Sequence, residues 1–273
     1  MANPPPKPAL QFPPESRIHI EPYLPPYSST PEAKAEPFLT LTFATSLDSS
    51  LSLAAGTQTI LSGPETKAMT HYLRSRHDAI LVGVGTAVAD NPALNCRIEG
   101  IGLEAQPRPV ILDPQGRFEI VNEKGVYAEC VRLAREGVGK GPLILTSNLD
   151  RGDGEWNGVL KACGGRYIVM PLSVEEDGFS WTDVLAVLSR EGIKSLMVEG
   201  GAHVINTLLQ EKYLHFVDSV IVTIAPVWLG QGGVAVSPPR AIDAGGKPKA
   251  AARLKEVKWQ QYGEDAVLCG RMN

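Results

Sequence analysis

One candidate binding site for a phosphate group in this sequence consists of two adjacent glycines that follow an acidic residue. Glu199-Gly200-Gly201 follows a short apolar run and precedes a segment with helical periodicity. Glycines at a helix N-terminus leave N–H groups free for a phosphate, and the helix dipole adds a partial positive charge. Glu199 would then lie at the carboxyl end of a strand, where open α/β sheets bind ligands. A tightly packed strand-to-helix turn is the alternative interpretation.

A second glycine pair follows another strand-like run. Residues 83–86 read Gly-Val-Gly-Thr and overlap the end of the apolar run 78–84. The pattern begins like the dinucleotide fingerprint GxGxxG, but its sixth position holds Val88, so it is a weak Rossmann signal. The glycines still allow a ligand to approach the backbone, and Thr86 offers a hydroxyl and an amide. A plain tight turn would explain the same residues.

Charged side chains that could orient a polar substrate lie close by in the sequence. Asp90 precedes Asn91-Pro92, and Arg97 follows in the same loop. A guanidinium suits a phosphate because its planar donors match the phosphate oxygens. Arg74 ends a predicted helix over 64–76, where the helix dipole favours any cation. By themselves these residues also fit a loop-stabilising carboxylate and two surface cations.

The composition argues against several other functions. The net charge is −4 and no long basic run occurs, so a nucleic-acid partner is not expected. No apolar run reaches the roughly 20 residues of a membrane-spanning helix, and no apolar segment typical of a secretory signal begins the chain, which predicts a cytosolic location. The four cysteines form no CxxC pair, so no metal site is expected and the zinc site of a deaminase is poorly supported.

The elements that must position these residues alternate along the chain. Apolar runs of strand length are found at 38–46, 78–84, 110–113, 143–146, 167–170, 195–199, 217–225, 255–262 and 266–270. Helical patterns separate most of them, at 64–76, 127–136, 156–163, 181–190 and 201–209. Because the last strands have no helix between them, the pattern predicts an α/β fold: a mostly parallel central sheet, antiparallel C-terminal edge strands and helices on both faces.

The N-terminal region has a different composition. Eleven of the 22 prolines lie at or before position 37. Proline lacks an N–H donor and has a fixed φ, so this region cannot form the interior of a helix or sheet. The sequence therefore predicts a disordered or extended tail over 1–37 and a single domain over 38–273, which is long enough to bury a large core.

Taken together, these runs resemble a known family. The block from Gly56 to Arg97, with Ser46-Leu47-Asp48 before it and the run 196–209 after it, resembles the reductases of the riboflavin pathway, and most of all their stand-alone fungal form. The resemblance covers about residues 38–270. It implies a dihydrofolate-reductase-like fold, a homodimer and NADPH as hydride donor. It also implies reduction of the ribosylamino side chain of 2,5-diamino-6-ribosylamino-4(3H)-pyrimidinone 5′-phosphate to the ribitylamino form.

The resemblance further assigns residues to ligands. On the NADPH side it places Ala44, Thr86, Asp90, Gly200, Gly201, Ala202 and His203. On the substrate side it places Thr57, Arg74, Leu94, Arg97 and Glu199, with the two arginines on the ribose phosphate and Glu199 on the sugar or base. Asp90 is the candidate for handling the proton. Ser49 and Ser50 stand where many relatives have a glycine and a basic residue.

Two other functions stay open at this point. One is a reductase of the same fold that acts on another pterin or pyrimidine. The other is a regulatory dimer that binds NADPH without turnover. The pair Arg74 and Arg97 favours a phosphorylated sugar over a folate-like ring system, and the polar residues Asp90 and Glu199 argue against a protein that only binds the nucleotide.

Overall fold

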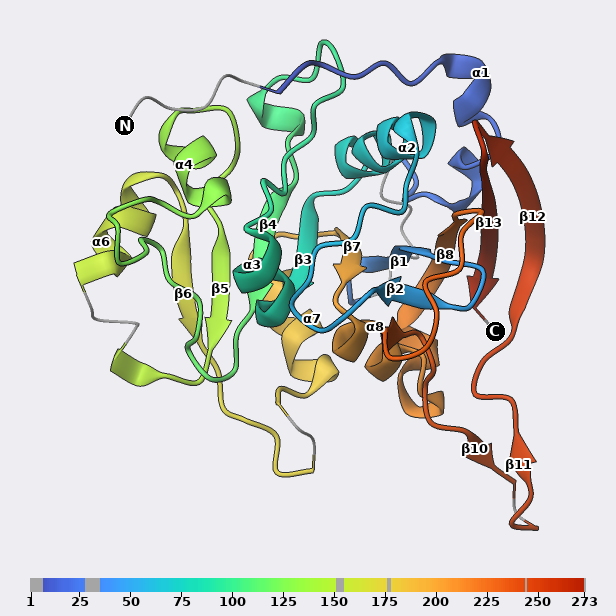
Figure 1. Ribbon diagram of the computed structural model, residues 1–273. Coiled ribbons are helices and arrows are strands. Elements are labelled where there is room, and N and C mark those ends of the chain that lie inside the picture. The colour runs from blue at the N-terminus through green and yellow to red at the C-terminus, as the bar shows by residue number, and fades with distance from the viewer. Residues whose placement is uncertain (1–6, 28–34, 151–154, 176–177, 244, 273) are drawn as a thin grey trace.

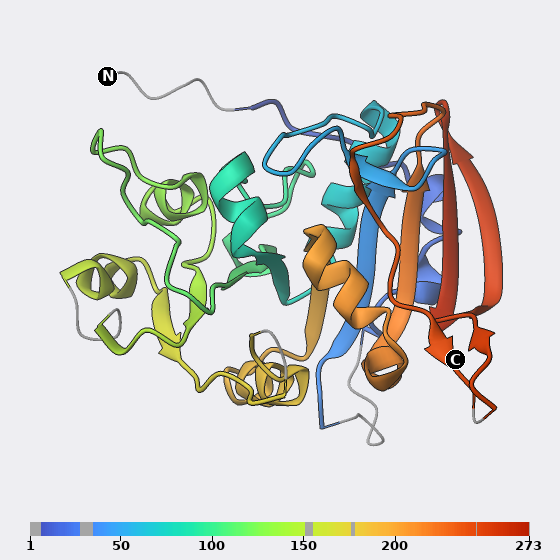
Figure 2. The same cartoon turned by 60° about the horizontal axis from the view of Figure 1, so that its bottom comes forward.

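A nine-stranded sheet runs through the part of the chain that the computed structural model describes, which is residues 7–27, 35–150, 155–175, 178–243 and 245–272. Its strand order is β12-β13-β8-β1-β7-β3-β4-β5-β6, with the C-terminal strands at one edge and β6 at the other (Figures 1 and 2). The pairs from β8 to β6 are all parallel, whereas β13 runs antiparallel to both β8 and β12. The predicted α/β architecture is confirmed.

The strands of this sheet are β1 (Phe38–Thr45), β3 (Ala79–Gly83), β4 (Arg108–Leu112), β5 (Leu143–Thr146), β6 (Arg166–Val169), β7 (Ser195–Gly200), β8 (Val217–Ile224), β12 (Leu254–Tyr262) and β13 (Asp265–Met272). Two small ribbons pair β2 (Ser50–Ser52) with β9 (Val234–Ala235) and β10 (Ala241–Ile242) with β11 (Pro248–Lys249). The second ribbon extends from the domain as an arm (Figures 1 and 2). This ribbon lies within the Pro- and Gly-rich stretch 238–252.

The α-helices are α1 (Pro14–Arg17), α2 (Pro64–Ser75), α3 (Val84–Asp90), α4 (Glu129–Arg135), α6 (Glu155–Ala162), α7 (Trp181–Arg190) and α8 (Ala202–Leu208). The 3-10 helices are η1 (Glu21–Tyr23), η2 (Leu103–Ala105) and η3 (Glu211–Phe216). Alternation along the strands sends their side chains to two apolar layers. In β3, Leu81 joins the core under α7 and α8, whereas Ile80 joins the core under α4 and α6. In β7, Met197 packs under α2.

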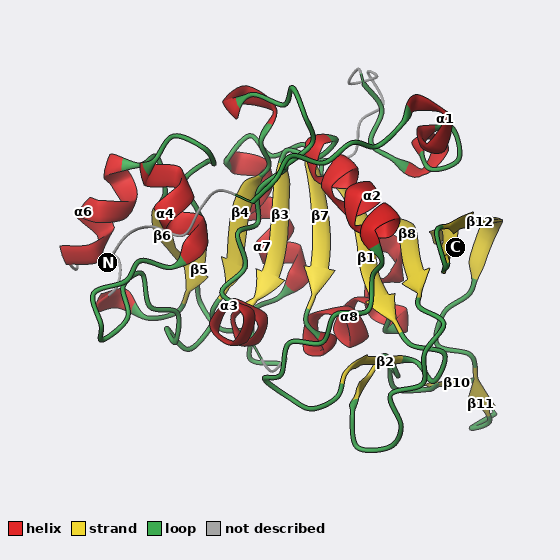
Figure 3. Ribbon diagram, turned by 45° about the horizontal axis from the view of Figure 1, so that its top comes forward, coloured by secondary structure: helices red, strands yellow, loops and turns green. Residues whose placement is uncertain are grey.

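The position of β7 explains why distant parts of the sequence meet. It is inserted between β1 and β3, so Val198 pairs with both Leu41 and Leu81. The carboxyl ends of these parallel strands lie at the same edge of the sheet, where α3, α8 and β2 also lie (Figure 3). Open parallel sheets bind ligands at this edge.

The N-terminal segment corrects one prediction. Residues 7–27 are not an unpacked tail, because Phe12, Ile20 and Tyr23 are buried in the core formed with α2. Leu10 also forms a bridge with Ile98 through two backbone hydrogen bonds: Leu10 N–H donates to the Arg97 carbonyl, and Glu99 N–H donates to the Leu10 carbonyl. The prolines are accommodated because this segment is mostly irregular and lies outside the sheet. The rest of the predicted tail includes 1–6 and 28–34, which are outside the described residues.

Candidate functional site

The two glycine turns predicted from the sequence lie side by side. Val82 of β3 pairs with Gly200 of β7, so the turns that follow both strands are neighbours. A Cβ on Gly201 would come within 2.7 Å of the Thr86 Oγ1, and a Cβ on Gly83 within 3.1 Å of the Val204 side chain. A side chain at Gly201 would therefore displace the Thr86 hydroxyl, and we call the two closely packed turns the glycine cradle.

The acidic residue of the second turn forms a buried ion pair. Arg74, in the last turn of α2, donates from Nε to Glu199 Oε1 at 2.7 Å and from Nη2 to Oε2 at 2.6 Å. Its Nη1 donates to the Asn95 carbonyl at 3.0 Å. The side chains of Arg74 and Glu199 are only 13% and 17% exposed. Such a bidentate pair holds the carboxylate in one orientation beside the glycine cradle.

The second arginine has a different environment. Arg97 donates from Nη1 to the Pro8 carbonyl at 2.8 Å, and its Nη2 lies 3.3 Å from Nε2 of His71. Its backbone N–H donates to Nδ1 of His71 at 3.1 Å. Burial, and then the nearby charge of Arg74, lower the pKa of Arg97. The two arginines therefore share one region of positive charge in which only Arg74 has a carboxylate partner among the described residues.

The other predicted residues occupy several settings. Thr86 and Asp90 lie one turn apart on α3, and burial raises the pKa of the Asp90 carboxyl. Leu94 is almost fully buried in the same core cluster as Val82, and its contact with the substrate stays a prediction. Thr57 is exposed in the loop after β2.

Two further positions lie near the strand ends. Ala44 is half-buried and pairs with Thr223 of β8. At the start of α8, Ala202 is half-buried, whereas the His203 side chain is exposed. These residues are thus at the same edge of the sheet as the glycine cradle, and their contacts with ligands stay predictions.

The turn after β1 is held by a carboxylate. Asp48 accepts a hydrogen bond from the Ser46 hydroxyl and from the N–H groups of Leu229 and Gly230, at 3.1 and 2.7 Å. These bonds, with the Ser46 hydroxyl first, lower the pKa of Asp48 to about 2. Ser49 has a φ of 60°, a conformation that glycine adopts more easily. Asp48 therefore ties the turn to the segment after β8.

The sequence analysis did not identify two residues that hold parts of the candidate site, His71 and Asp48. His71 has no motif around it, although it lies on the same face of α2 as Arg74, and Asp48 was noted only within its turn. Both residues accept hydrogen bonds from backbone N–H groups that are distant in the sequence, and such contacts leave no local sequence pattern.

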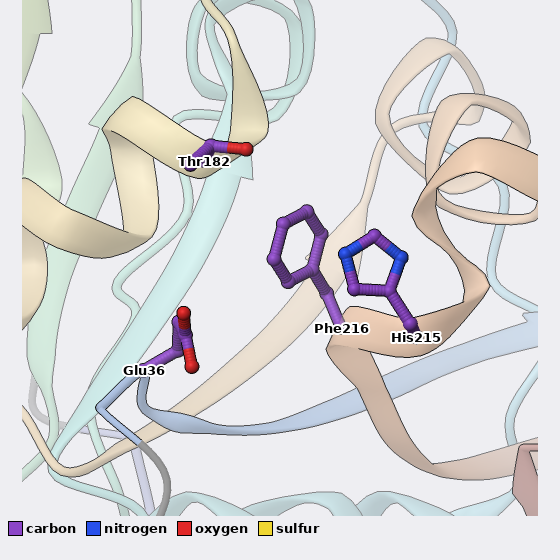
Figure 4. Close-up of a pocket in the computed structure, with 4 residues that line it drawn as sticks. All are labelled: Glu36, Thr182, His215 and Phe216. Atoms are coloured by element: carbon purple, nitrogen blue, oxygen red, sulfur yellow. The ribbon is translucent and has the colours of Figure 1, made fainter.

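Other hollows lie away from this site. One of about 430 Å³ is lined by Glu36, Thr182, His215 and Phe216, near the amino ends of β1 and β8 (Figure 4). Within the described residues, no group of three or more His, Cys, Asp or Glu side chains is placed to hold a metal ion. Nor does any described helix have the length and apolar character needed to cross a membrane.

The sheet, the glycine cradle at its carboxyl edge and the adjacent ion pair define an α/β protein whose candidate site lies where open parallel sheets bind ligands. A family model described as "RibD C-terminal domain" matches residues 37–268, and the chain belongs to this family. It is 42% identical to the 2,5-diamino-6-ribosylamino-4(3H)-pyrimidinone 5′-phosphate reductase of Debaryomyces hansenii, over 96% of this chain and 98% of that protein. It is 36% identical to the reductase of the same name from Saccharomyces cerevisiae, over 93% of each chain.

Solved structures agree with this relationship. The riboflavin biosynthesis reductase of Saccharomyces cerevisiae superimposes with a TM-score of 0.73 at 35% identity, covering 94% of this chain and 98% of that one. A RibD protein of Acinetobacter baumannii superimposes with a TM-score of 0.67 at 22% identity, over 88% of this chain and 59% of that one, and so shows the shared fold alone.

Proposed function

We propose that this chain reduces the ribosylamino side chain of 2,5-diamino-6-ribosylamino-4(3H)-pyrimidinone 5′-phosphate to the ribitylamino form, with NADPH as hydride donor. The observation that carries the proposal is the Arg74–Glu199 pair directly beside the Gly200-Gly201 turn. In this proposal the pair places polar groups for the substrate next to the glycines that would bind the nucleotide, both at the carboxyl end of β7. The names of the fungal relatives, which align over nearly their whole length, support the same reaction.

The residues at the strand ends fit a dinucleotide. Gly200 and Gly201 carry no side chain, so no Cβ stands between their backbone N–H groups and a ligand. In the proposal, Gly200, Gly201 and Ala202 hold the pyrophosphate, Thr86 contacts the same group, and Ala44 lies against the nicotinamide. His203, the exposed residue at the start of α8, completes the predicted NADPH side. When bound, NADPH supplies the hydride, and the protein contributes position and electrostatics.

The substrate residues then divide the ligand between them. Arg97 binds the phosphate, and Arg74 orients Glu199 toward hydroxyls of the sugar or polar atoms of the base. Opening of the ribose ring places a C1′=N bond in this site and moves a proton to O4′. Bound NADPH would supply the hydride for C1′ and the nitrogen would take up one proton, so that one NADPH and one proton would be consumed. Thr57 and Leu94 complete the predicted substrate side.

Asp90 is the proposed proton handler. It follows Thr86 by one helical turn, so both side chains lie on the same side of α3. Burial raises the pKa of Asp90, which favours the protonated carboxyl that a proton donor requires. Replacement of Asp90 by Asn should lower kcat more than it changes KM for the substrate.

We further propose that the protein works as a homodimer. Strand β12 is a sheet edge whose residues from Lys255 to Gln261 are exposed, with Val257 and Trp259 among them. An unpaired, partly apolar edge strand is suited to association with a second copy. Sedimentation equilibrium of the wild type and of Trp259→Lys tests this assembly. The cytosolic location stays a prediction.

The activity is tested by following NADPH absorbance with substrate generated from GTP by a GTP cyclohydrolase II. Loss of absorbance together with a product heavier by two hydrogens supports the reaction. Arg97→Ala should raise KM by about 10-fold or more, because a charge-assisted contact with the phosphate is lost. Binding of NADPH without turnover would instead favour a nucleotide-binding regulator or another substrate, and absence of NADPH binding would contradict the proposal.

A further inference from the structure

A buried histidine stands next to the arginine that the proposed function assigns to the phosphate. His71 lies on α2 with only 6% of its surface exposed. It shares a helix face with Lys67 one turn before it and Arg74 one turn after it. Both of its ring nitrogens face N–H groups of Arg97, one on the backbone and one on the guanidinium.

The protonation of this ring follows from its neighbours. Burial first, and then the charges of Arg74, Arg97 and Lys67, lower the pKa of His71 to about 2, against a small opposing effect of the Asn95 carbonyl. The ring is therefore neutral near pH 7 and carries one proton. Because Nδ1 accepts the Arg97 backbone N–H at 3.1 Å, that proton must be on Nε2.

This tautomer creates a pair of donors without an acceptor between them. The Nε2–H of His71 faces Nη2 of Arg97, and the two nitrogens are 3.3 Å apart. Two N–H groups cannot bond to each other, so an acceptor oxygen placed between them would satisfy both. The Pro8 carbonyl accepts a hydrogen bond from the other guanidinium nitrogen, Nη1. The Asn95 carbonyl accepts one from Arg74 and also interacts with the His71 ring, so a phosphate oxygen would compete with it for the ring N–H.

The positive charge around the two N–H donors favours an acceptor oxygen that belongs to an anion. Glu199 neutralises Arg74, whereas Arg97 and Lys67 have no carboxylate partner in the ion pairs of the described residues. A phosphate oxygen is an acceptor of suitable charge that can bond several donors at once. A neutral histidine donor adds a directed bond here without adding a further cation.

We propose that His71 is a further binding residue for the substrate phosphate, donating Nε2–H to the same phosphate oxygen that Arg97 Nη2 binds. The inference rests on the proposed function for the identity of the ligand. It differs from a merely structural role, in which His71 would only accept the Arg97 backbone N–H and hold the loop.

Two substitutions separate these roles. His71→Asn retains an acceptor near the position of Nδ1 but has no donor at the position of Nε2. His71→Gln can place an amide N–H near the position of Nε2 but has no acceptor at Nδ1. Affinity for ribose 5-phosphate, measured by titration calorimetry in the presence of NADPH, is the readout, with inorganic phosphate as a second probe.

The expected result is a loss of about 10-fold or more in affinity for His71→Asn, with less than about 3-fold for His71→Gln. Equal affinity of His71→Asn and the wild type would overturn the proposal, as would a larger loss in His71→Gln than in His71→Asn. Thermal melting of both variants shows whether either is misfolded, and nitrogen chemical shifts of the wild-type ring report the tautomer directly. A ring protonated on Nδ1 would also refute it.

This test can be told apart from a failure of the proposed function. If the wild type binds ribose 5-phosphate but does not turn over the pyrimidinone substrate, the reaction is wrong and the phosphate site stands. If the wild type turns over the substrate and His71→Asn has an unchanged KM, the reaction stands and the role of His71 is wrong.

Discussion

Glu199→Gln should destabilise the protein far more than the same change in a surface ion pair. The substitution keeps the size of the side chain and removes the charge that faces Arg74. Arg74 donates two hydrogen bonds to Glu199, at 2.7 and 2.6 Å, and both side chains are mostly buried. Removing one partner of a buried pair costs about 3–5 kcal/mol because it leaves an uncompensated charge.

The exposure of the pair sets the expected value within that range. Since 13% and 17% of the two side chains remain in contact with solvent, water can partly compensate Arg74, and we expect a loss of about 3 kcal/mol in the free energy of unfolding. The matched control is Glu191→Gln. Its partner Arg166 is 49% exposed, so this surface pair should contribute only about 0–1 kcal/mol.

Urea unfolding followed by circular dichroism measures both values, and the slope with denaturant should be the same in all variants. Removing both charges, as Arg74→Met with Glu199→Gln, should recover part of the stability, because no buried charge is left alone. The reasoning is refuted if Glu199→Gln costs no more than Glu191→Gln, or if the double variant is less stable than Glu199→Gln by the full cost of a second deletion.

Three further predictions concern other parts of the chain. Phe12→Ala should lower the free energy of unfolding by about 3–5 kcal/mol, measured in urea, because Phe12 is 3% exposed in the core of the domain. Asp48→Asn should destabilise the protein at neutral pH, and the difference from the wild type should disappear as pH falls from about 4 to about 2, because the pKa of Asp48 is lowered in the folded state. Cys163 should be the cysteine that a maleimide labels in the native protein, as seen by mass spectrometry, because the other three thiols are buried.

For each of these three predictions, a specific result would contradict the reasoning. A Phe12→Ala variant as stable as the wild type would mean that residues 7–27 do not contribute to the core. A stability difference for Asp48→Asn that persists at pH 2 would show that its hydrogen bonds do not depend on the charge. Rapid labelling of several cysteines in the native protein would contradict their burial, whereas labelling of all four is expected after denaturation.

The sequence was sufficient to locate the nine strands of the main sheet and most of the helices that separate them. Strands and helices are identified by local periodicity, which reflects the face that each element buries, and the runs 78–84 and 195–199 were located in this way. The glycine turns at Gly83 and Gly200 were also visible, because close backbone approach restricts the residue type at single positions. The family match confirms the resemblance, whereas the roles that the resemblance assigns to Arg97 and the other site residues stay predictions.

The prediction of an unpacked N-terminal tail, which rested on proline content, was wrong for residues 7–27. Proline excludes the interior of helices and sheets, but it does not prevent an irregular segment from placing Phe12 and Tyr23 in a core. Whether an irregular segment is buried depends on an apolar surface elsewhere in the chain that can receive it. Here that surface includes Met69 and Leu73 of α2.

By itself, therefore, the sequence determined which segments are strands, helices and glycine turns, because these depend on neighbours within a few residues. Only the tertiary structure decided which side chains are partners. Arg74 pairs with Glu199, which is 125 residues away, and Arg97 meets Pro8, which is 89 residues away. The first contact arises because β7 is inserted between β1 and β3, and the second because the N-terminal segment pairs with the loop at Ile98. Both are set by packing of the whole domain rather than by any local pattern.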